Sequence, residues 1–147
     1  MTVEERSAHL TLKATLRRVR TSALIVLLAL LGLAGCGKKA TPADGVRAVV
    51  TRFGDASAKQ DYQQICDQLL ARALVKNVEQ YGLPCELAFK QGLRGVRAPK
   101  LTIGAITVKG DRASARVTTT AANQQPSTDT LALRRADGEW RIAALDS

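Results

Sequence analysis

The sequence predicts an α+β fold in which three helices pack on one face of a curved, four-stranded antiparallel sheet. Apolar residues recur at helical spacing between residues 46 and 92, and they alternate with polar residues from Leu101 to Ala144. The pairs Gly110-Asp111 and Asp137-Gly138 are typical of tight turns between antiparallel strands. A chain of 147 residues is long enough for one such domain and short for two.

Residues 1–35 have the features of an export signal. Arg17, Arg18 and Arg20 precede an unbroken apolar run from Ala23 to Ala34. A positive flank followed by a short apolar run is typical of a secretory signal. The 12 residues of this run, as a helix, would span about 18 Å, whereas the hydrocarbon core of a bilayer is about 30 Å thick. The run therefore favours an export signal over a membrane-spanning helix.

The apolar run ends in Leu33-Ala34-Gly35-Cys36, which resembles the lipobox of bacterial lipoprotein precursors. The resemblance implies that the Cys36 thiol receives a diacylglyceryl group, with fatty acids such as palmitate, and that the signal is cut off before Cys36. Two or more acyl chains hold a protein stably on a bilayer. Residues 36–42 would then be the lipidated N-terminus and tether, and residues 43–147 would form a domain on the extracytoplasmic face of the cell membrane. The alternative is a non-lipidated signal with an incidental cysteine.

The first helix is expected from Pro42 to about Gln60. Thr41 is a good N-cap, Pro42 suits the first helical position, and Asp44 suits the first turn. One apolar stripe follows at helical spacing: Val46, Val49, Val50 and Phe53. This stripe predicts a helix with a single buried face.

Two more helices follow. Asp61 can cap a second helix, which we expect to run, straight or bent, as far as Gly82. A third and shorter helix is expected from Pro84 to about Gly92.

The cysteines predict a disulfide between the second and third helices. Lipidation of Cys36 would leave Cys66 and Cys85, and an even pair in an exported domain favours a disulfide because the compartment is oxidising. A metal site is the alternative, but two thiols are too few ligands, and the only histidine, His9, falls in the signal. We therefore expect a Cys66–Cys85 disulfide, no metal and no other cofactor.

Four strands joined as a meander are expected from residue 101. The alternation of the first strand slips at Gly104-Ala105, which predicts a β-bulge that bends the strand. Residues 112–121 predict the second strand, and residues 124–127, which include Pro126, predict a longer loop. The third strand is expected around Leu131 and Leu133, and the last strand holds Trp140, Ile142 and Ala144.

Short segments carry a resemblance to a known family: residues 53–62, Cys66 to Leu70, Cys85 to Phe89, Val108 to Ala113 and Asp137 to Ile142. They resemble NTF2-like (cystatin-like) domains of exported actinobacterial lipoproteins, over roughly residues 43–146. The resemblance implies a cone between the helices and the curved sheet, in which a ligand site lies. Residues 124–130 depart from the pattern, because they are short and polar where many members carry longer strands. The depth of the pocket therefore does not follow from the resemblance.

Four aromatic residues are the candidates for a pocket in this cone: Phe53, Tyr62, Tyr81 and Trp140. For the two tyrosines and the tryptophan, packing in the core is the favoured interpretation over contact with a ligand, since they lie on apolar faces of the predicted helices and strand. A ligand held there would be a small apolar molecule.

Catalysis and nucleic-acid binding have little support in the sequence. Without His9 no Ser-His-Asp or Cys-His arrangement can form, and Gly92 to Gly95 lacks the spacing of a phosphate-binding loop. From residue 36 onward the chain keeps 17 Lys and Arg against 11 Asp and Glu, a net charge of +6. Aromatic residues do not interleave with these bases as nucleic-acid stacking requires, so anionic lipid or wall polymers are a better match than nucleic acid. A plain solvated basic surface is the favoured interpretation of the charge.

Two hypotheses follow for the function. The first is a non-catalytic, membrane-anchored module that binds a small apolar ligand or docks an envelope protein. The alternative is an isomerase- or dehydratase-type enzyme that uses Asp55 or Asp61 with Tyr62.

Overall fold

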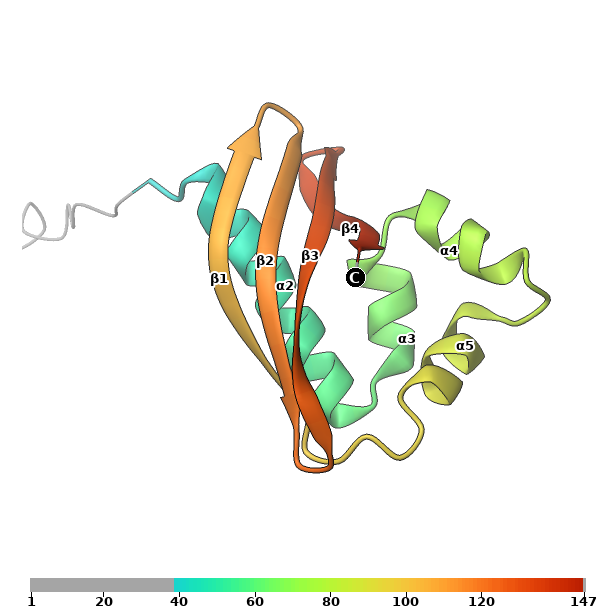
Figure 1. Cartoon of the computed structure of the whole chain (residues 1–147). Helices are drawn as coiled ribbons and strands as arrows, with labels where there is room; N and C mark the ends of the chain where they lie inside the picture. Colours follow the sequence, from blue (N-terminus) through green and yellow to red (C-terminus); the bar gives the residue numbers. More distant parts are fainter. Residues whose placement is uncertain (1–38, 147) are drawn as a thin grey trace, which may run out of the picture. The chain divides into compact units, whose positions relative to one another are not determined.

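The computed structural model describes residues 39–146, and the chain from Ala40 onward forms one compact unit. Its elements are α2 (Pro42–Lys59), α3 (Tyr62–Gln64), η1 (Ile65–Leu69), α4 (Arg72–Glu79), α5 (Cys85–Gly92), β1 (Lys100–Lys109), β2 (Arg112–Ala121), β3 (Gln124–Ala136) and β4 (Glu139–Asp146). Figure 1 shows α2 crossing one face of a curved sheet, with the remaining helices on the side of β4. The predicted α+β class is confirmed. The expected signal and Cys36 lie outside the described residues.

Helix α2 begins as the sequence predicts, at a reciprocal cap. The Thr41 hydroxyl accepts a hydrogen bond from the Asp44 backbone N–H at 3.2 Å, and the Asp44 carboxylate accepts one from the Thr41 backbone N–H at 2.8 Å. Hydrogen bonds from the Thr41 backbone and hydroxyl, with a smaller attraction to Arg47, hold the pKa of Asp44 below its usual range against a slight desolvation. These bonds fix the point at which the chain enters the domain.

Two glycines let α2 lie close against the sheet. A Cβ atom on Gly45 would stand 2.9 Å from Cδ1 of the Trp140 ring, and one on Gly54 would stand 3.0 Å from Cβ of Leu101. The N-terminal end of α2 therefore lies by the start of β4, and its C-terminal half lies by the start of β1. The helix crosses the whole sheet and buries Val46, Val49, Val50 and Ala56 against it.

The second predicted helix is not continuous. It breaks at Leu70, where the backbone becomes extended and forms a parallel bridge to Ile142 of β4. The Ala71 N–H then donates to the Ile142 carbonyl at 2.7 Å. This strand-like contact covers part of the exposed edge of β4, and it divides the second predicted helix into the segment α3–η1 and helix α4.

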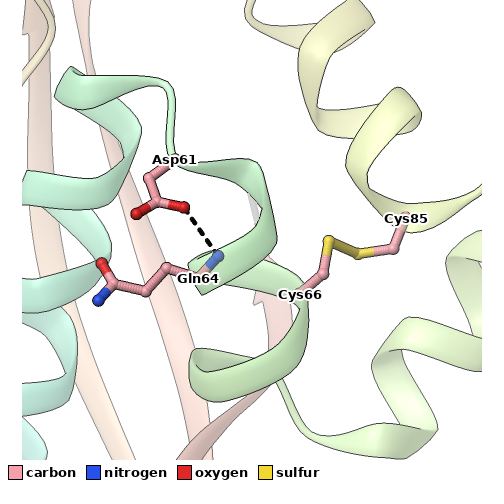
Figure 2. The surroundings of a disulfide bond; sticks show 4 residues. All are labelled: Asp61, Gln64, Cys66 and Cys85. Atoms are coloured by element: carbon pink, nitrogen blue, oxygen red, sulfur yellow. Dashed lines mark hydrogen bonds between the residues drawn. A yellow bond between two sulfur atoms is a disulfide. The ribbon is translucent and has the colours of Figure 1, made fainter.

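The predicted disulfide is present and joins η1 to the start of α5 (Figure 2). Cys66 and Cys85 are both buried, with their Cα atoms 6.1 Å apart. In the same figure the Asp61 carboxylate caps α3 by accepting a hydrogen bond from the Gln64 N–H at 3.0 Å. The bridge ties α5, in which Cys85 is the one buried residue, to η1, which buries Ile65, Cys66 and Leu69 in the core.

The sheet is a meander in the order β1-β2-β3-β4. Its concave face is apolar and carries the residues that pack under α2: Ala113, Ala115 and Val117 of β2, Leu131 and Leu133 of β3, and Trp140 and Ile142 of β4. The register of β1 against β2 shifts between Ile103 and Ile106, as the predicted bulge requires. The shift returns Ile106 and Val108 to the same face as Ile103.

The expected loop at residues 124–127 is wrong. Strand β3 already begins at Gln124, and the turn before it is short. Pro126 is tolerated because it lies where the register against β2 shifts, between the pairs Thr119–Ser127 and Ala121–Gln124. Strand β3 is therefore 13 residues long and extends well past the end of β4.

None of the helices within residues 39–146 combines the length and apolar character needed to cross a bilayer.

Candidate functional site

A cavity of about 260 Å³ lies at the end of the domain where β2 turns into β3. Helices α2 and α5, the segment that follows α5, and the ends of β1, β2 and β3 enclose it. The lining residues are Phe53, Gly54, Ser57, Phe89, Gly92, Leu93, Val96, Pro99, Lys100, Leu101, Thr119, Thr120, Ala121, Gln124, Gln125 and Ser127. The cavity thus lies between the helices and the concave face of the sheet, as the predicted cone requires.

The helical wall of the cavity is apolar and aromatic. Phe53 of α2 and Phe89 of α5 meet edge to face, with ring centroids 6.3 Å apart and planes at 78°. Leu93, Val96 and Leu101 continue this wall. Both rings are only partly buried, so they leave apolar surface for a ligand to cover.

Asn123 holds the segment between α5 and β1 against the β2–β3 turn. Its side-chain oxygen accepts a hydrogen bond from the Arg97 N–H at 3.0 Å, and its side-chain amide donates to the Gly95 carbonyl at 2.8 Å. The Ala122 N–H also donates to the Arg97 carbonyl, at 2.8 Å. Gly95 supports the turn with a φ of 78°. One rim of the cavity is therefore fixed by hydrogen bonds.

The sheet wall of the cavity is polar. Along the concave face the cross-strand pairs run from Ala115–Leu131 through Val117–Asp129 to Thr119–Ser127. Direct partners in an antiparallel pair share a face, so Asp129 and Ser127 continue the row of Leu131. The concave row becomes polar at the end of the sheet that borders the cavity.

These three polar side chains form a hydrogen-bonded chain. The Ser127 hydroxyl donates to the Asp129 carboxylate at 3.0 Å, and the Thr119 and Ser127 hydroxyl oxygens are 2.7 Å apart. An ionised carboxylate only accepts, and a serine hydroxyl carries one proton, so Thr119 must donate to Ser127. Both hydroxyl protons are then used, and the oxygens that line the cavity offer lone pairs. Such a row accepts hydrogen bonds from N–H or O–H groups of a ligand.

Of the four aromatic candidates, only Phe53 lines this cavity. Tyr62 packs half-buried against the core, while Tyr81 is 82% exposed after the end of α4, away from any apolar face. Trp140 is 7% exposed and lies against Gly45, at the end of the domain opposite the cavity. Tyr62 and Trp140 thus pack in the core, as the favoured interpretation has it, and the candidate place in the pocket is corrected for both of them and for Tyr81.

The acids of the enzyme alternative are not brought to the cavity either. Asp55 is exposed on α2, and Asp61 is exposed and occupied as the cap of α3. Neither lines the cavity with Tyr62. Within residues 39–146, no group of three or more His, Cys, Asp and Glu side chains is placed to hold a metal ion.

The sequence contained a signal for the polar row that the strand prediction missed. Leu131 and Leu133 show which side chains of β3 face the core. Alternate residues of a strand share a face, so Asp129 and Ser127, two and four positions before Leu131, face the same way. Treating Pro126 as part of a loop ended the strand too early for this step.

Comparison with known proteins supports the same fold. A profile of the family described as "Putative lumazine-binding" matches residues 42–145. The chain is similar to the crystal structure of an NTF2-like protein of unknown function from Shewanella baltica, with 18% sequence identity and a TM-score of 0.52, covering 69% of this chain and 87% of that one. It is also similar to a protein named Rd1NTF2_05, with 13% identity and a TM-score of 0.51, covering 70% and 96% of the two chains. No curated protein matches the chain. The domain is NTF2-like.

Proposed function

Because the chain belongs to the family described as "Putative lumazine-binding", we propose that it is a membrane-anchored lipoprotein whose NTF2-like domain binds a compact planar heterocycle without catalysing a reaction. The observation that carries this proposal is the cavity of about 260 Å³, with aromatic rings on one wall and a hydroxyl–carboxylate row on the other. Ligand pockets are typically concave, mostly apolar and equipped with a few placed polar groups.

The volume and chemistry of the cavity define the ligand class. About 260 Å³ is slightly below the usual range of about 300–1,000 Å³ for pockets that hold drug-sized molecules, which favours a small ligand. Apolar ring faces would lie against Phe53 and Phe89, and an N–H edge would donate to Thr119 and Ser127. Lumazine, a flat bicycle with ring N–H groups, has this combination and is the natural first probe.

The lining favours binding over catalysis. A general acid or base must lie within hydrogen-bond reach of the atom it serves. The residues that line the cavity include no carboxylate, histidine, cysteine or tyrosine, and their one titratable side chain is that of Lys100. Asp129, the carboxylate behind the lining, is separated from the cavity by Ser127. Binding without chemistry is the simplest role for such a site.

The proposed anchor is Cys36, and the proposed location is the extracytoplasmic face of the cell membrane, as in exported actinobacterial lipoproteins. The lipobox-like Leu33-Ala34-Gly35-Cys36 supports it, together with the apolar run before it. The buried Cys66–Cys85 disulfide also suits an oxidising compartment. Replacing Cys36 with serine should move the protein from the membrane fraction to the soluble fraction. Unchanged membrane association would contradict the anchor.

Calorimetric titration of the full chain with lumazine tests the binding proposal. Two neighbouring residues of β2 give a matched pair of variants, because Thr119 faces the cavity and Thr118 faces the other side of the sheet. Thr119→Val should weaken binding about tenfold, the effect of one lost hydrogen bond of about 1.4 kcal/mol, whereas Thr118→Val should leave the affinity unchanged. No binding by the unaltered chain, or equal loss in both variants, would refute the cavity as the site.

A further inference from the structure

A row of basic residues crosses the convex face of the sheet. Lys109 pairs with Arg112, Arg112 with Arg134, and Arg134 with Arg141, so one cation from each strand stands at the same level. Direct partners in an antiparallel sheet have Cα atoms about 4.5–5.5 Å apart and share a face. Because Ala113, Leu133 and Ile142 beside them are buried on the concave side, these cations belong to the convex side.

Three members of this row have no acidic partner within the described part of the chain. The one ion pair of residues 39–146 joins Arg141 to Glu139 at 2.9 Å, and Arg141 also donates to the Asp67 carbonyl at 3.0 Å, so its side chain is turned to the edge of the sheet. Like charges placed directly opposite each other destabilise a sheet. Lys109, Arg112 and Arg134 therefore form an unneutralised set, and we call these three residues the cation row.

The cation row borders a shallow hollow of about 510 Å³ on the convex face. The next level of the sheet forms its floor, with the register Thr107–Ser114–Ala132–Ala144. These small side chains leave room for a group to approach the backbone, and two of them carry hydroxyls. Three cations beside two hydroxyls suit a group with phosphate oxygens.

The cation row lies at the end of the domain where the chain enters. Gly45, in the first turns of α2, touches the ring of Trp140, and Trp140 is next to Arg141 in the same strand. Figure 1 shows the N-terminal end of α2 at the end of the sheet that carries the β1–β2 and β3–β4 turns. Thr41 follows Cys36 by five positions, a reach of at most about 18 Å even when fully extended. A lipid on Cys36 would hold this end of the domain against the bilayer.

We propose that the cation row docks this end of the domain on an anionic phospholipid bilayer, which leaves the ligand cavity at the opposite end open to the space beyond the membrane. This inference rests on the proposed anchor at Cys36. Charge complementarity favours phospholipid over a second copy of the chain, since two copies facing each other here would bring two cation rows together. The acids nearby, Asp111 and Asp137, lie in the turns and not in the hollow.

Energy transfer from Trp140, the only tryptophan of the chain, to dansyl-labelled lipid reports the docking. The full chain is reconstituted in phosphatidylcholine vesicles with and without phosphatidylglycerol. We expect higher transfer with phosphatidylglycerol, and we expect the difference to vanish at about 1 M salt, where the Debye length is about 3 Å. Transfer that is equal in the two vesicles would overturn the proposal. Transfer that instead rises with protein density would point to a second copy and overturn it too.

Two triple variants make the test specific. Replacing Lys109, Arg112 and Arg134 with glutamine should lower the docking equilibrium about 100-fold at low salt, because each basic residue near an anionic surface contributes about fivefold. Replacing Lys76, Lys90 and Arg94, three exposed cations near α4 and α5, removes the same charge and should leave docking unchanged. Equal losses in both would mean that net charge, and not the row, is responsible, which contradicts the proposal.

Failure of the anchor and failure of the docking give different results. Mass spectrometry of the purified N-terminus tests lipidation at Cys36 by itself. A chain that keeps residues 23–34 still carries an apolar segment that ends seven positions before Thr41 in the sequence, so the vesicle measurement tests docking even when lipid is absent.

Discussion

Reduction of the Cys66–Cys85 disulfide should lower the free energy of unfolding by about 3 kcal/mol. The bridge closes a loop with a sequence separation of 19 residues. In the chain-entropy relation, a loop of about 15 residues contributes about 3 kcal/mol at 25 °C and longer loops contribute slowly more. For a domain of about 100 residues, each kcal/mol changes the melting temperature by about 4–8 °C. The reduced protein should therefore melt at least about 12 °C lower.

The assay is thermal unfolding of the full chain, followed by circular dichroism with and without a phosphine reductant. Reduction keeps both sulfur atoms in the core, so the change in melting temperature measures the effect of the cross-link and not that of a packing defect. The double variant Cys66→Ser with Cys85→Ser should melt near the reduced protein and should not respond to reductant. If two free thiols appear on reduction while the melting temperature falls by less than about 4 °C, the loop-entropy reasoning is wrong for this domain.

Three further predictions concern stability. Gly45→Ala should lower the free energy of unfolding by about 1 kcal/mol or more in denaturant titration, because its Cβ would stand 2.9 Å from the Trp140 ring. The control Gly92→Ala, whose Cβ would have nothing within 4 Å, should be neutral or stabilising, and equal effects of the two variants would contradict the close approach of α2. The pKa of Asp44 is lowered by folding, so the stability that this carboxylate contributes is present above its unfolded pKa of about 3.9 and is lost as pH falls through the folded pKa. Asp44→Asn should therefore weaken the pH dependence of the melting temperature below about pH 4, and an unchanged pH dependence would contradict the cap. Arg112→Gln should raise the free energy of unfolding by about 0.2–1 kcal/mol by relieving repulsion from its cross-strand partners, and a loss of stability would show that the arginine is neutralised in the folded protein.

Local chemistry made the first helix and most of the sheet predictable. Thr41, Pro42 and Asp44 specify the start of α2 without help from the rest of the fold, and the β1 bulge follows from the parity slip at Gly104-Ala105. The break at Leu70 was not predictable, because no glycine or proline marks it. Its cause is a contact with Ile142, 72 positions later, which the local pattern does not contain. Tyr81 was misplaced for a related reason, since the break ends the helical register that had put it on an apolar face.

Aromatic residues have different roles at the two ends of the domain: they fill the core at one end and line the cavity at the other. At the entry end, the absence of a side chain on Gly45 admits the Trp140 ring, which fills the space between α2 and β4 and leaves only 7% of the tryptophan exposed. At the far end, Phe53 and Phe89 are only partly buried, and the concave row changes from Leu131 to Asp129 and Ser127. A polar row costs little where ligand or water can satisfy it and would be costly beneath Trp140, where the core is closed. Two features of the sequence therefore fix the position of the cavity. Trp140 closes the entry end of the domain, and the concave row of β3 changes from Leu131 to Asp129 and Ser127 toward the far end.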